Sequence, residues 1–325
     1  MTIPAGRPGW LGALIVLLCA AMFGSLGTLS RFAYEDGMAP FAFVAWRAGV
    51  ATLAIWLAIL VIRRPSRIRR EIGTLDGRGR RWLFAGILLA GSLNLAAFLS
   101  FANTTVALAL LGFYTYPAMV AAGSVLLGRE RLDLARVAAL VLALGGMVAV
   151  VLGGPAIDAV GNAGFLGIGL ALAAALFQTG FVLTTRGYGA LAAEYATGAI
   201  LVGSAAISIV ITVVADGPAA IAYPFSRPDL LALLLYVGIF AAAVPSLLFL
   251  TGIRAIGGVR TGILMLFEPV VGVALAAIFL AEGLQPLQVA GGATILLAAL
   301  LVQRTSGAKA APTEPVVIAP APGGP

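Results

Sequence analysis

Residues 264 to 283 read LMLFEPVVGVALAAIFLAEG, an apolar run that carries an ionisable Glu268 directly before a helix-disturbing Pro269. A second run has the same frame, because residues 112 to 131 read GFYTYPAMVAAGSVLLGRER. A shift of 152 positions (269 − 117) places Pro117 on Pro269. The stretch that holds the buried charge therefore has a counterpart in the first half of the chain.

The similarity between the halves extends beyond this proline. The same shift places Glu130 on Glu282, so both copies read proline, twelve residues, glutamate. A second match pairs AMFGSLGTLSR at 21 to 31 with ALFQTGFVLTT at 175 to 185, an offset of 154 that a small insertion explains. We interpret the chain as two copies of one unit.

The composition is that of a membrane protein. Of 325 residues 61% are hydrophobic and 10% charged, with a mean hydropathy of +1.08, far outside the proportions of soluble proteins. The chain has no His, and its one Cys is Cys19 in the first apolar run. Metal sites, Ser-His-Asp triads and Cys-His pairs are not expected, so the composition argues against an enzyme.

The apolar runs predict an all-α integral membrane protein of ten transmembrane helices. A helix needs roughly 20 apolar residues to cross the hydrocarbon core, and strands would need shorter segments of alternating polarity. The first run is too long for a signal-peptide core and lacks a small-x-small cleavage site, so we interpret it as a retained helix. The predicted spans are 10–30, 40–62, 82–102, 105–127, 134–153, 163–184, 195–215, 230–253, 258–280 and 286–303.

The basic side chains in the loops indicate the orientation. With the N-terminus inside, 17 of the 20 Lys and Arg residues lie on the cytoplasmic side, and the outer side holds Arg31 and Arg227. We expect the protein to lie in a bacterial inner membrane with both termini in the cytoplasm. The division explains a pI near 10.2 without nucleic acid as a partner. The loop at 63 to 81 is read as a topology anchor, with a lipid head-group segment as the alternative.

The domain organisation follows from the repeat. We predict a cytoplasmic N-terminus (1–9), a first five-helix repeat (10–153), an outer linker (154–162), a second five-helix repeat (163–303) and a disordered tail (304–325). Because five is odd, the second copy enters the membrane from the opposite face. Such inverted-topology repeats are characteristic of secondary transporters, which enclose a site near the bilayer midplane.

Glu268 is the first candidate site residue. It lies some eleven residues into its span from Gly257, near the midplane, where a charge costs at least ~2.5–3.5 kcal/mol. Pro269 lacks an amide hydrogen and frees backbone there to face a cavity. Glu268 is predicted to bind a substrate ammonium or to carry a proton; a carboxylate bonded to a neighbouring helix is the structural alternative. In the first half its equivalent is Tyr116.

Further candidates are polar or aromatic residues within the spans. Arg47 would bind a substrate carboxylate, pair with an acid or snorkel to the outer surface. Aromatic stripes would line the site or pack, and Ser25 and Gln178 would bind substrate or join helices. The predicted substrate-binding set is Glu268, Tyr116, Asn94, Phe98, Phe113, Gln178, Ser25, Arg47 and Ser246, with hinges at Pro117, Pro269 and Pro245 and no metal.

These blocks resemble the drug/metabolite transporter superfamily in its EamA-type ten-helix branch. The resemblance rests on the paired proline–glutamate blocks, on FGS at 23 to 25, and on Arg47 and Asn94, over roughly residues 10 to 303. Length and arrangement are also similar to the YddG-type amino-acid exporters of that branch. The resemblance implies export of amino acids or related metabolites, aromatic amino acids first.

Several alternatives stay open at this point. A multidrug or nucleotide-sugar carrier is the second expectation, although a phosphorylated substrate would need more intramembrane cations than Arg47. A non-transporting membrane scaffold is the third. No phosphate-binding G-x-x-x-x-G-K-[ST] motif occurs, so gradients rather than ATP would supply energy and no cofactor is expected. The expected partners are the bilayer and a small-molecule substrate, with coupling to protons left open, and the expected state is a monomer or weak dimer.

Overall fold

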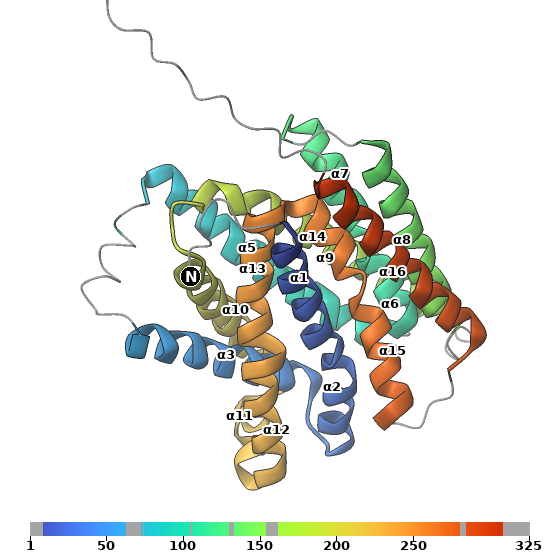
Figure 1. The fold of residues 1–325 in the computed structure, drawn as a ribbon. Helices are drawn as coiled ribbons and strands as arrows, with labels where there is room; N and C mark the ends of the chain where they lie inside the picture. Colours follow the sequence, from blue (N-terminus) through green and yellow to red (C-terminus); the bar gives the residue numbers. More distant parts are fainter. Residues whose placement is uncertain are drawn as a thin grey trace, which may run out of the picture.

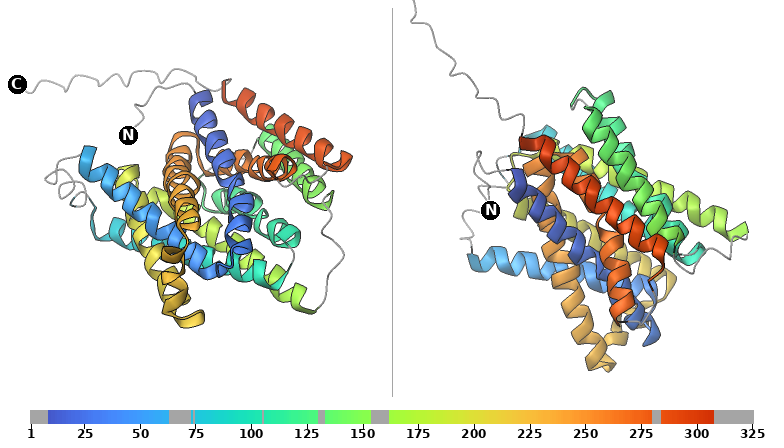
Figure 2. Two further views of the ribbon diagram at one scale, coloured as in Figure 1. Left: turned by 90° about the horizontal axis from the view of Figure 1, so that it is seen from below. Right: turned by 45° about the vertical axis from the view of Figure 1, so that its right-hand side comes forward.

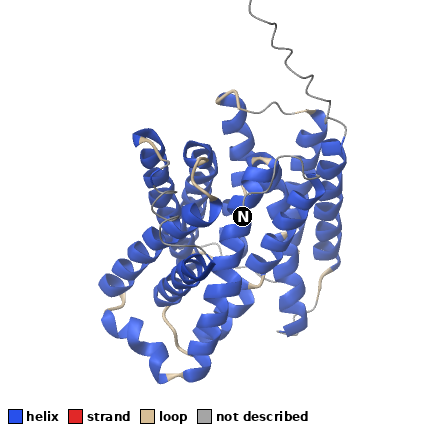
Figure 3. Ribbon diagram, turned by 60° about the vertical axis from the view of Figure 1, so that its left-hand side comes forward, coloured by secondary structure: helices blue, strands red, loops and turns tan. Residues whose placement is uncertain are grey.

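The computed structural model describes residues 9–62, 73, 75–104, 106–129, 133–153, 162–279 and 284–307, and their regular structure is helical (Figure 3). The first repeat holds α1 (Gly9–Gly24), α2 (Leu26–Glu35), α3 (Pro40–Ile62), α5 (Gly77–Asn103), α6 (Val106–Phe113), α7 (Tyr116–Leu126) and α8 (Leu134–Leu152) (Figure 1). The second holds α9 (Asn162–Thr184), α10 (Ala193–Ala215), α11 (Pro218–Ala222), α12 (Pro228–Gly238), α13 (Val244–Ile256), α14 (Gly258–Met265), α15 (Glu268–Phe279) and α16 (Pro286–Gly307). Glu130, Glu282 and most of the 63 to 81 loop lie outside the described residues.

The described helices correspond to the predicted spans. Eight helical stretches are at least 18 residues long and apolar enough to cross a membrane. The remaining two spans are α5, which has 27 residues and is apolar from Trp82 onward, and α16, whose apolar part Pro286–Leu301 is shorter. Within the described part of the chain, the prediction of ten helical spans is confirmed.

Polar side chains fix where two of the spans begin. The carboxylate of Asp76 accepts a hydrogen bond from the Gly79 amide at the start of α5 (2.6 Å), and Asp133 accepts one from the Arg136 amide at the start of α8 (2.9 Å). Each satisfies an amide that has no partner in the first helical turn. Both spans therefore begin at acidic caps that lie outside the apolar runs.

The two repeats pack as related halves. α1 packs against α13 in the second repeat, and its equivalent α9 packs against α5, the equivalent of α13, in the first. The second and seventh spans (α3 and α10) pack on each other, as do the fifth and tenth (α8 and α16), which lie side by side in the views of Figures 1 and 2. Exchanging the halves therefore maps these four helix pairs onto one another.

The α8–α16 pair illustrates how closely these helices approach. A Cβ atom on Gly146 would lie 2.7 Å from the carbonyl oxygen of Gly291, and one on Gly291 would lie 2.5 Å from the carbonyl oxygen of Gly146. Backbone therefore packs on backbone at this crossing. Small residues at helix interfaces permit such approach in membranes, where van der Waals contact drives association.

A pair of adjacent glycines tests this packing. Gly146→Ala is expected to lower the free energy of unfolding by about 1–3 kcal/mol, because the added methyl meets the backbone of α16. Gly145→Ala is the matched control, since a Cβ there has no atom within 4 Å and alanine favours the helix. Thermal unfolding in detergent, followed by tryptophan fluorescence, would measure both. Equal midpoints for the two variants would contradict the close crossing.

Candidate functional site

Helix breaks at equivalent places in the two halves form the frame of the site. α6 ends at Phe113 and α7 begins at Tyr116, while α14 ends at Met265 and α15 begins at Glu268. The predicted hinges Pro117 and Pro269 are the second residues of α7 and α15, where the missing proline N–H interrupts the helical bonds. The structure thus places these prolines at two breaks related by the repeat.

The two broken spans contact each other beside these breaks. α14 packs against α7, and a Cβ on Gly262 would lie 3.2 Å from the Cβ of Pro117. α14 is enclosed by its neighbours, with Val259 and Thr261 through Leu264 all buried. Glu268 therefore follows a tightly packed half-helix.

Glu268 is the first residue of α15 and is half-buried. The phenol of Tyr114, in the break between α6 and α7, donates a hydrogen bond to its carboxylate. Tyr114 is only 1% exposed, so this bond lies inside the protein. The N-terminus of α15 also favours a negative charge through the helix dipole. Glu268 thus belongs to the second repeat, and its hydrogen-bond donor Tyr114 belongs to the first.

Two further buried groups surround the same carboxylate. Tyr116, the first residue of α7, is 2% exposed, and Cys19 of α1 is fully buried; both interact electrostatically with Glu268. The Cys19 thiol donates a hydrogen bond to the carbonyl oxygen of Pro245 (3.2 Å). The predicted residues Glu268 and Tyr116 are therefore brought together, at the junction of α1, α7, α13 and α15.

Aromatic rings form one wall of this junction. Phe113, half-buried at the end of α6, lies 5.3 Å from the ring of Tyr116 and 5.4 Å from that of Tyr114 between centroids. Tilted contacts at this spacing are favourable packing for aromatic rings. The Glu268 carboxylate thus adjoins a wall of three aromatic side chains.

Arg47 and Asn94 form a second polar group. The Arg47 guanidinium, half-buried on α3, donates through Nη2 to the Asn94 side-chain oxygen on α5 (2.9 Å). The Asn94 amide in turn donates to the carbonyl oxygen of Ala90 (2.8 Å), which fixes its orientation. The buried Nε of Arg47 has no hydrogen-bond partner. Arg47 is therefore bonded to a neighbouring helix and has donor capacity left over.

The two polar groups act on each other without touching. Arg47 and Glu268 interact electrostatically, yet among the described residues they form no ion pair with each other. Arg47 donates a hydrogen bond to Asn94, and Glu268 accepts one from Tyr114. Opposite charges thus stand apart in the interior of the helix bundle.

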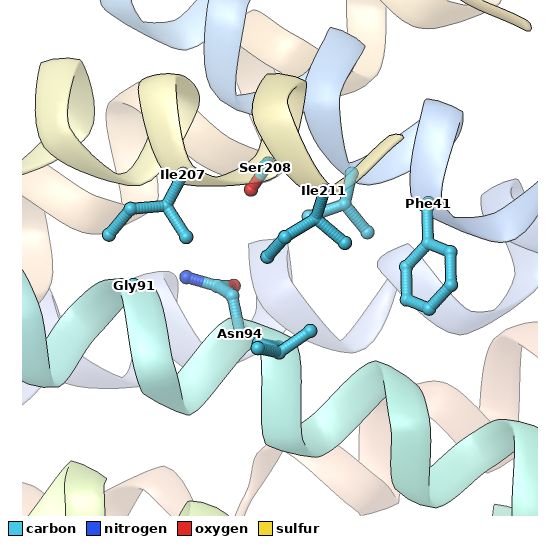
Figure 4. Close-up of a pocket in the computed structure, with 8 residues that line it drawn as sticks. Phe41, Gly91, Asn94, Ile207, Ser208 and Ile211 are labelled. Carbon is cyan, nitrogen blue, oxygen red and sulfur yellow. The ribbon is translucent and has the colours of Figure 1, made fainter. Parts of the chain in front are cut away.

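A narrow cleft adjoins the Arg47–Asn94 group between α3, α5 and α10 (Figure 4). The Asn94 amide points from α5 toward α10, where Ile207 and Ser208 face it. The other lining residues, Phe41, Val44, Gly91, Leu95 and Ile211, carry no polar side-chain atoms. The cleft is therefore apolar, with Asn94 and Ser208 as its polar contribution.

The remaining predicted residues are distributed differently. The hydroxyl of Ser25, between α1 and α2, donates to the carbonyl oxygen of Met22 (2.7 Å) in its own turn. Gln178 is buried in α9, and Ser246 is half-buried in α13 beside Pro245. Pro245 lies two residues after the end of a π-helical segment, Ile239–Ala243 (η3), a local distortion of the kind often found at functional sites. The side chain of Phe98 lies outside the described residues.

Tyr114 and Cys19 are the site residues that the sequence interpretation did not assign. Tyr114 lies three residues before Pro117, but sequence alone does not show that the chain turns there and presents its phenol to the other repeat. Cys19 entered only as the single cysteine in the argument against metal sites and Cys-His pairs. In the described residues, no three His, Cys, Asp or Glu side chains group as metal ligands.

Comparisons with known proteins agree with this architecture. The sequence model of the EamA-like transporter family matches the chain twice, over residues 10–152 and 165–304. No curated protein matches the chain. One solved crystal structure superposes with a TM-score of 0.76 over 91% of this chain and 98% of that chain, at 17% sequence identity. At that identity the likeness concerns the fold alone.

Two asparagines of α5 test the Arg47–Asn94 bond. Asn94→Ala is expected to cost about 1–3 kcal/mol of unfolding free energy, because it leaves the partly buried guanidinium without its partner. Asn103 makes the same bond to its own helix, from Nδ2 to the Leu99 carbonyl oxygen (2.8 Å), so Asn103→Ala is the matched control. Thermal unfolding in detergent measures the difference. A cost for Asn94→Ala no larger than that of the control would contradict the bond.

Proposed function

The chain belongs to the EamA-like transporter family, and from this premise we propose that it exports amino acids, aromatic ones first, by alternating access around the Glu268 and Arg47 groups. Family membership makes it a multi-pass membrane transporter of the drug/metabolite type. The observation that carries the proposal is the pair of opposite charges, which are coupled inside the bundle but not bonded to each other.

A zwitterion fits between two such charges. The carboxylate of an α-amino acid matches the planar donor fork of Arg47, which retains an unpartnered Nε. The ammonium of the same molecule matches the Glu268 carboxylate. Binding would replace the long-range attraction between the two side chains with two direct charge-assisted bonds.

The aromatic wall favours substrates with an apolar body. Tyr114 and Tyr116 interact with Glu268, and Phe113 packs on both rings, so an ammonium bound at Glu268 would also meet aromatic side chains. A nucleotide-sugar substrate is less suited, because its phosphates would have Arg47 as the one cation coupled to this group among the described residues. A multidrug carrier for apolar cations is the alternative; it would use Glu268 and the rings without requiring Arg47.

The proposed orientation places both termini in the cytoplasm of a bacterium with the chain in its inner membrane. In that orientation the packed α7–α14 contact lies between Glu268 and the cytoplasm. Loading of an exporter from the cytoplasm would require this contact to separate. Pro117 and Pro269, at the adjoining breaks, are the proposed hinges, with Pro245 next to the π-helical segment as the third.

Reporter fusions test the orientation. Green fluorescent protein fused after residue 325 is expected to fluoresce, and alkaline phosphatase at the same place to stay inactive, because the C-terminus is cytoplasmic. Alkaline phosphatase inserted within residues 154–162 is expected to be active. The opposite pattern at both positions would reverse the proposed topology and the direction of transport with it.

Flux measurements test the transport proposal and the part played by Glu268. Labelled phenylalanine or tryptophan is expected to enter proteoliposomes that hold the purified protein, and Glu268→Gln is expected to reduce the flux at least tenfold, because it removes one charge-assisted bond worth about 1.5–3 kcal/mol. Glu35→Gln is the matched control, since Glu35 is an exposed carboxylate at the end of α2.

A pH gradient separates two roles of the carboxylate. Flux that ignores the gradient and is lost in Glu268→Gln would make the carboxylate a fixed binding group in a facilitator. Flux that follows the gradient, with the dependence lost in the variant, would make it the proton site. Absence of flux for every amino acid from a folded preparation would refute the amino-acid proposal in favour of the multidrug alternative.

A further inference from the structure

An apolar cluster built by both repeats fills the end of the bundle that faces outward in the proposed orientation. We call it the outer plug. Its members are each at most 3% exposed, and α12 packs there against α2 and α3, as the lower end of the view in Figure 1 shows. They are Ala33, Met38, Ala42 and Phe43 of the first repeat and Leu230, Leu234, Val237 and Ala241 of the second.

The outer plug adjoins the Arg47 group. α3 begins at Pro40, seven residues before Arg47 (47 − 40), and Phe43 shares the face of α3 that carries Arg47, at i and i+4. The ring of Tyr34 on α2 packs edge-on against Phe43, with 5.6 Å between centroids. Tyr34 also interacts electrostatically with Arg47. The plug thus stands between Arg47 and the outer end of these helices.

A short segment of the second repeat ties the rim of the plug. We define it as the strap: residues 221–227, from the end of α11 through the 3-10 turn η2 (Tyr223–Ser226) to Arg227. Nη2 of Arg227 forms an ion pair with Oδ1 of Asp36 (2.8 Å), and the Tyr223 phenol donates to the Asp36 carbonyl oxygen (2.7 Å). Asp36 lies in the turn between α2 and α3. Both bonds therefore join the second repeat to the first.

A second attachment of the strap lies one residue from Arg47. The indole N–H of Trp46 on α3 donates to the carbonyl oxygen of Ile221 (2.9 Å). The Trp46 ring also meets the ring of Phe225 edge-on, with 5.2 Å between centroids. Because α12 begins at Pro228, directly after the strap, its separation from α2 and α3 would pull on all of these bonds.

The ion pair of the strap is suited to breaking and reforming. Its side chains are 44% and 39% exposed, so water and salt screen their attraction. At the opposite end of the bundle, Arg129 also bonds across the repeats, but it donates to the neutral carbonyl oxygen of Leu183. The offset of 154 between the repeats places Asp36 on Ala190 (36 + 154), so the carboxylate of the strap is not repeated. The outer tie therefore has a sensitivity to salt of its own.

We infer that the strap is the outer latch of the transport cycle: it holds the outer plug closed beside the Arg47 group, and outward release requires its bonds to Asp36 and Trp46 to open. The inference rests on the proposed alternating access and orientation. It does not depend on the substrate, because the latch touches the plug and the α2–α3 turn alone.

A thiol placed in the plug tests this inference by reporting how often the plug opens. Ala42→Cys changes a fully buried plug residue, and a membrane-impermeant maleimide added to spheroplasts measures its exposure from outside. The unmodified chain, with the buried Cys19 as its one cysteine, gives the background. Asp36→Asn and Arg227→Gln are each expected to raise the labelling rate about two- to fivefold, the range that one exposed ion pair contributes.

Matched variants separate the latch from a general effect of lost charge. Glu35→Gln removes the exposed carboxylate next to Asp36 and is expected to leave the rate unchanged. Arg129→Gln removes the arginine bond at the opposite end and is expected not to raise it. Ala143→Cys on α8 is a second reporter, also 0% exposed but outside the plug. Its labelling is expected to stay at background in every variant.

Salt gives an independent readout of the same pair. Raising NaCl from ~50 mM to ~500 mM screens an exposed pair, so labelling at Ala42→Cys is expected to rise in the presence of the pair and to stay constant in Asp36→Asn. The double variant Asp36→Asn, Arg227→Gln is expected to match either single variant, because each change removes the same interaction. Ala241→Cys, on the other side of the plug, serves as the reporter if Ala42→Cys fails to fold.

The outcomes separate the latch from the transport proposal. Labelling at the unmodified rate in both Asp36→Asn and Arg227→Gln would overturn the latch. An equal increase at Ala143→Cys would also overturn it, because the helices would then have loosened throughout. Faster labelling from the cytoplasmic side alone, in inverted vesicles, would overturn its outer location. No substrate is present in these measurements, so absence of amino-acid flux would refute the substrate and leave the latch standing.

Discussion

A guanidinium and a carboxylate inside apolar helices constrain the rest of the structure. Each charge costs at least ~2.5–3.5 kcal/mol at the bilayer centre unless the protein supplies partners. Asn94 on α5 supplies one to Arg47, and Tyr114 in the α6–α7 break supplies one to Glu268. Because both partners come from across a helix interface, the charges stabilise the arrangement of helices while leaving donor and acceptor capacity for a bound molecule.

The helix breaks follow from the same constraint. Inside a continuous helix the backbone N–H groups are already hydrogen-bonded and do not stabilise a carboxylate. The start of α15 at Glu268 instead presents the positive end of a helix dipole. The break before Pro117 brings Tyr114 to that carboxylate from the other repeat. The breaks are paired by the duplication, yet the chemistry is not, since Tyr116 stands where the second repeat has Glu268. Symmetry belongs to the scaffold and asymmetry to the site.

Much of the fold was predictable because hydrophobic length and charge carry strong signals in membranes. The ten spans follow from the length of the apolar runs, and the duplication follows from the repeated proline–glutamate spacing. Glu268, Arg47 and Asn94 stand out because they are polar residues within apolar runs. Tyr114 did not, because its role depends on the turn between α6 and α7 and on a neighbour 154 residues away (268 − 114). The helix break at Ser25 could not be predicted from a proline, because none lies there. The Ser25 hydroxyl donates to the carbonyl oxygen of Met22, and the sequence alone does not distinguish a serine bonded to its own turn from one that binds substrate.

A symmetric scaffold around an asymmetric site limits how the protein can change state. At the α8–α16 crossing the two backbones are in direct contact. Separating the helices would lose these van der Waals contacts, and the glycines have no side chains to replace them. The α7–α14 contact is different, because Gly262 meets a proline ring and both helices end at breaks. In the alternating access that we propose, movement at the breaks would separate these two helices. For the alternating access that we propose, we therefore expect the half-helices to move about the site and the glycine crossing to stay closed.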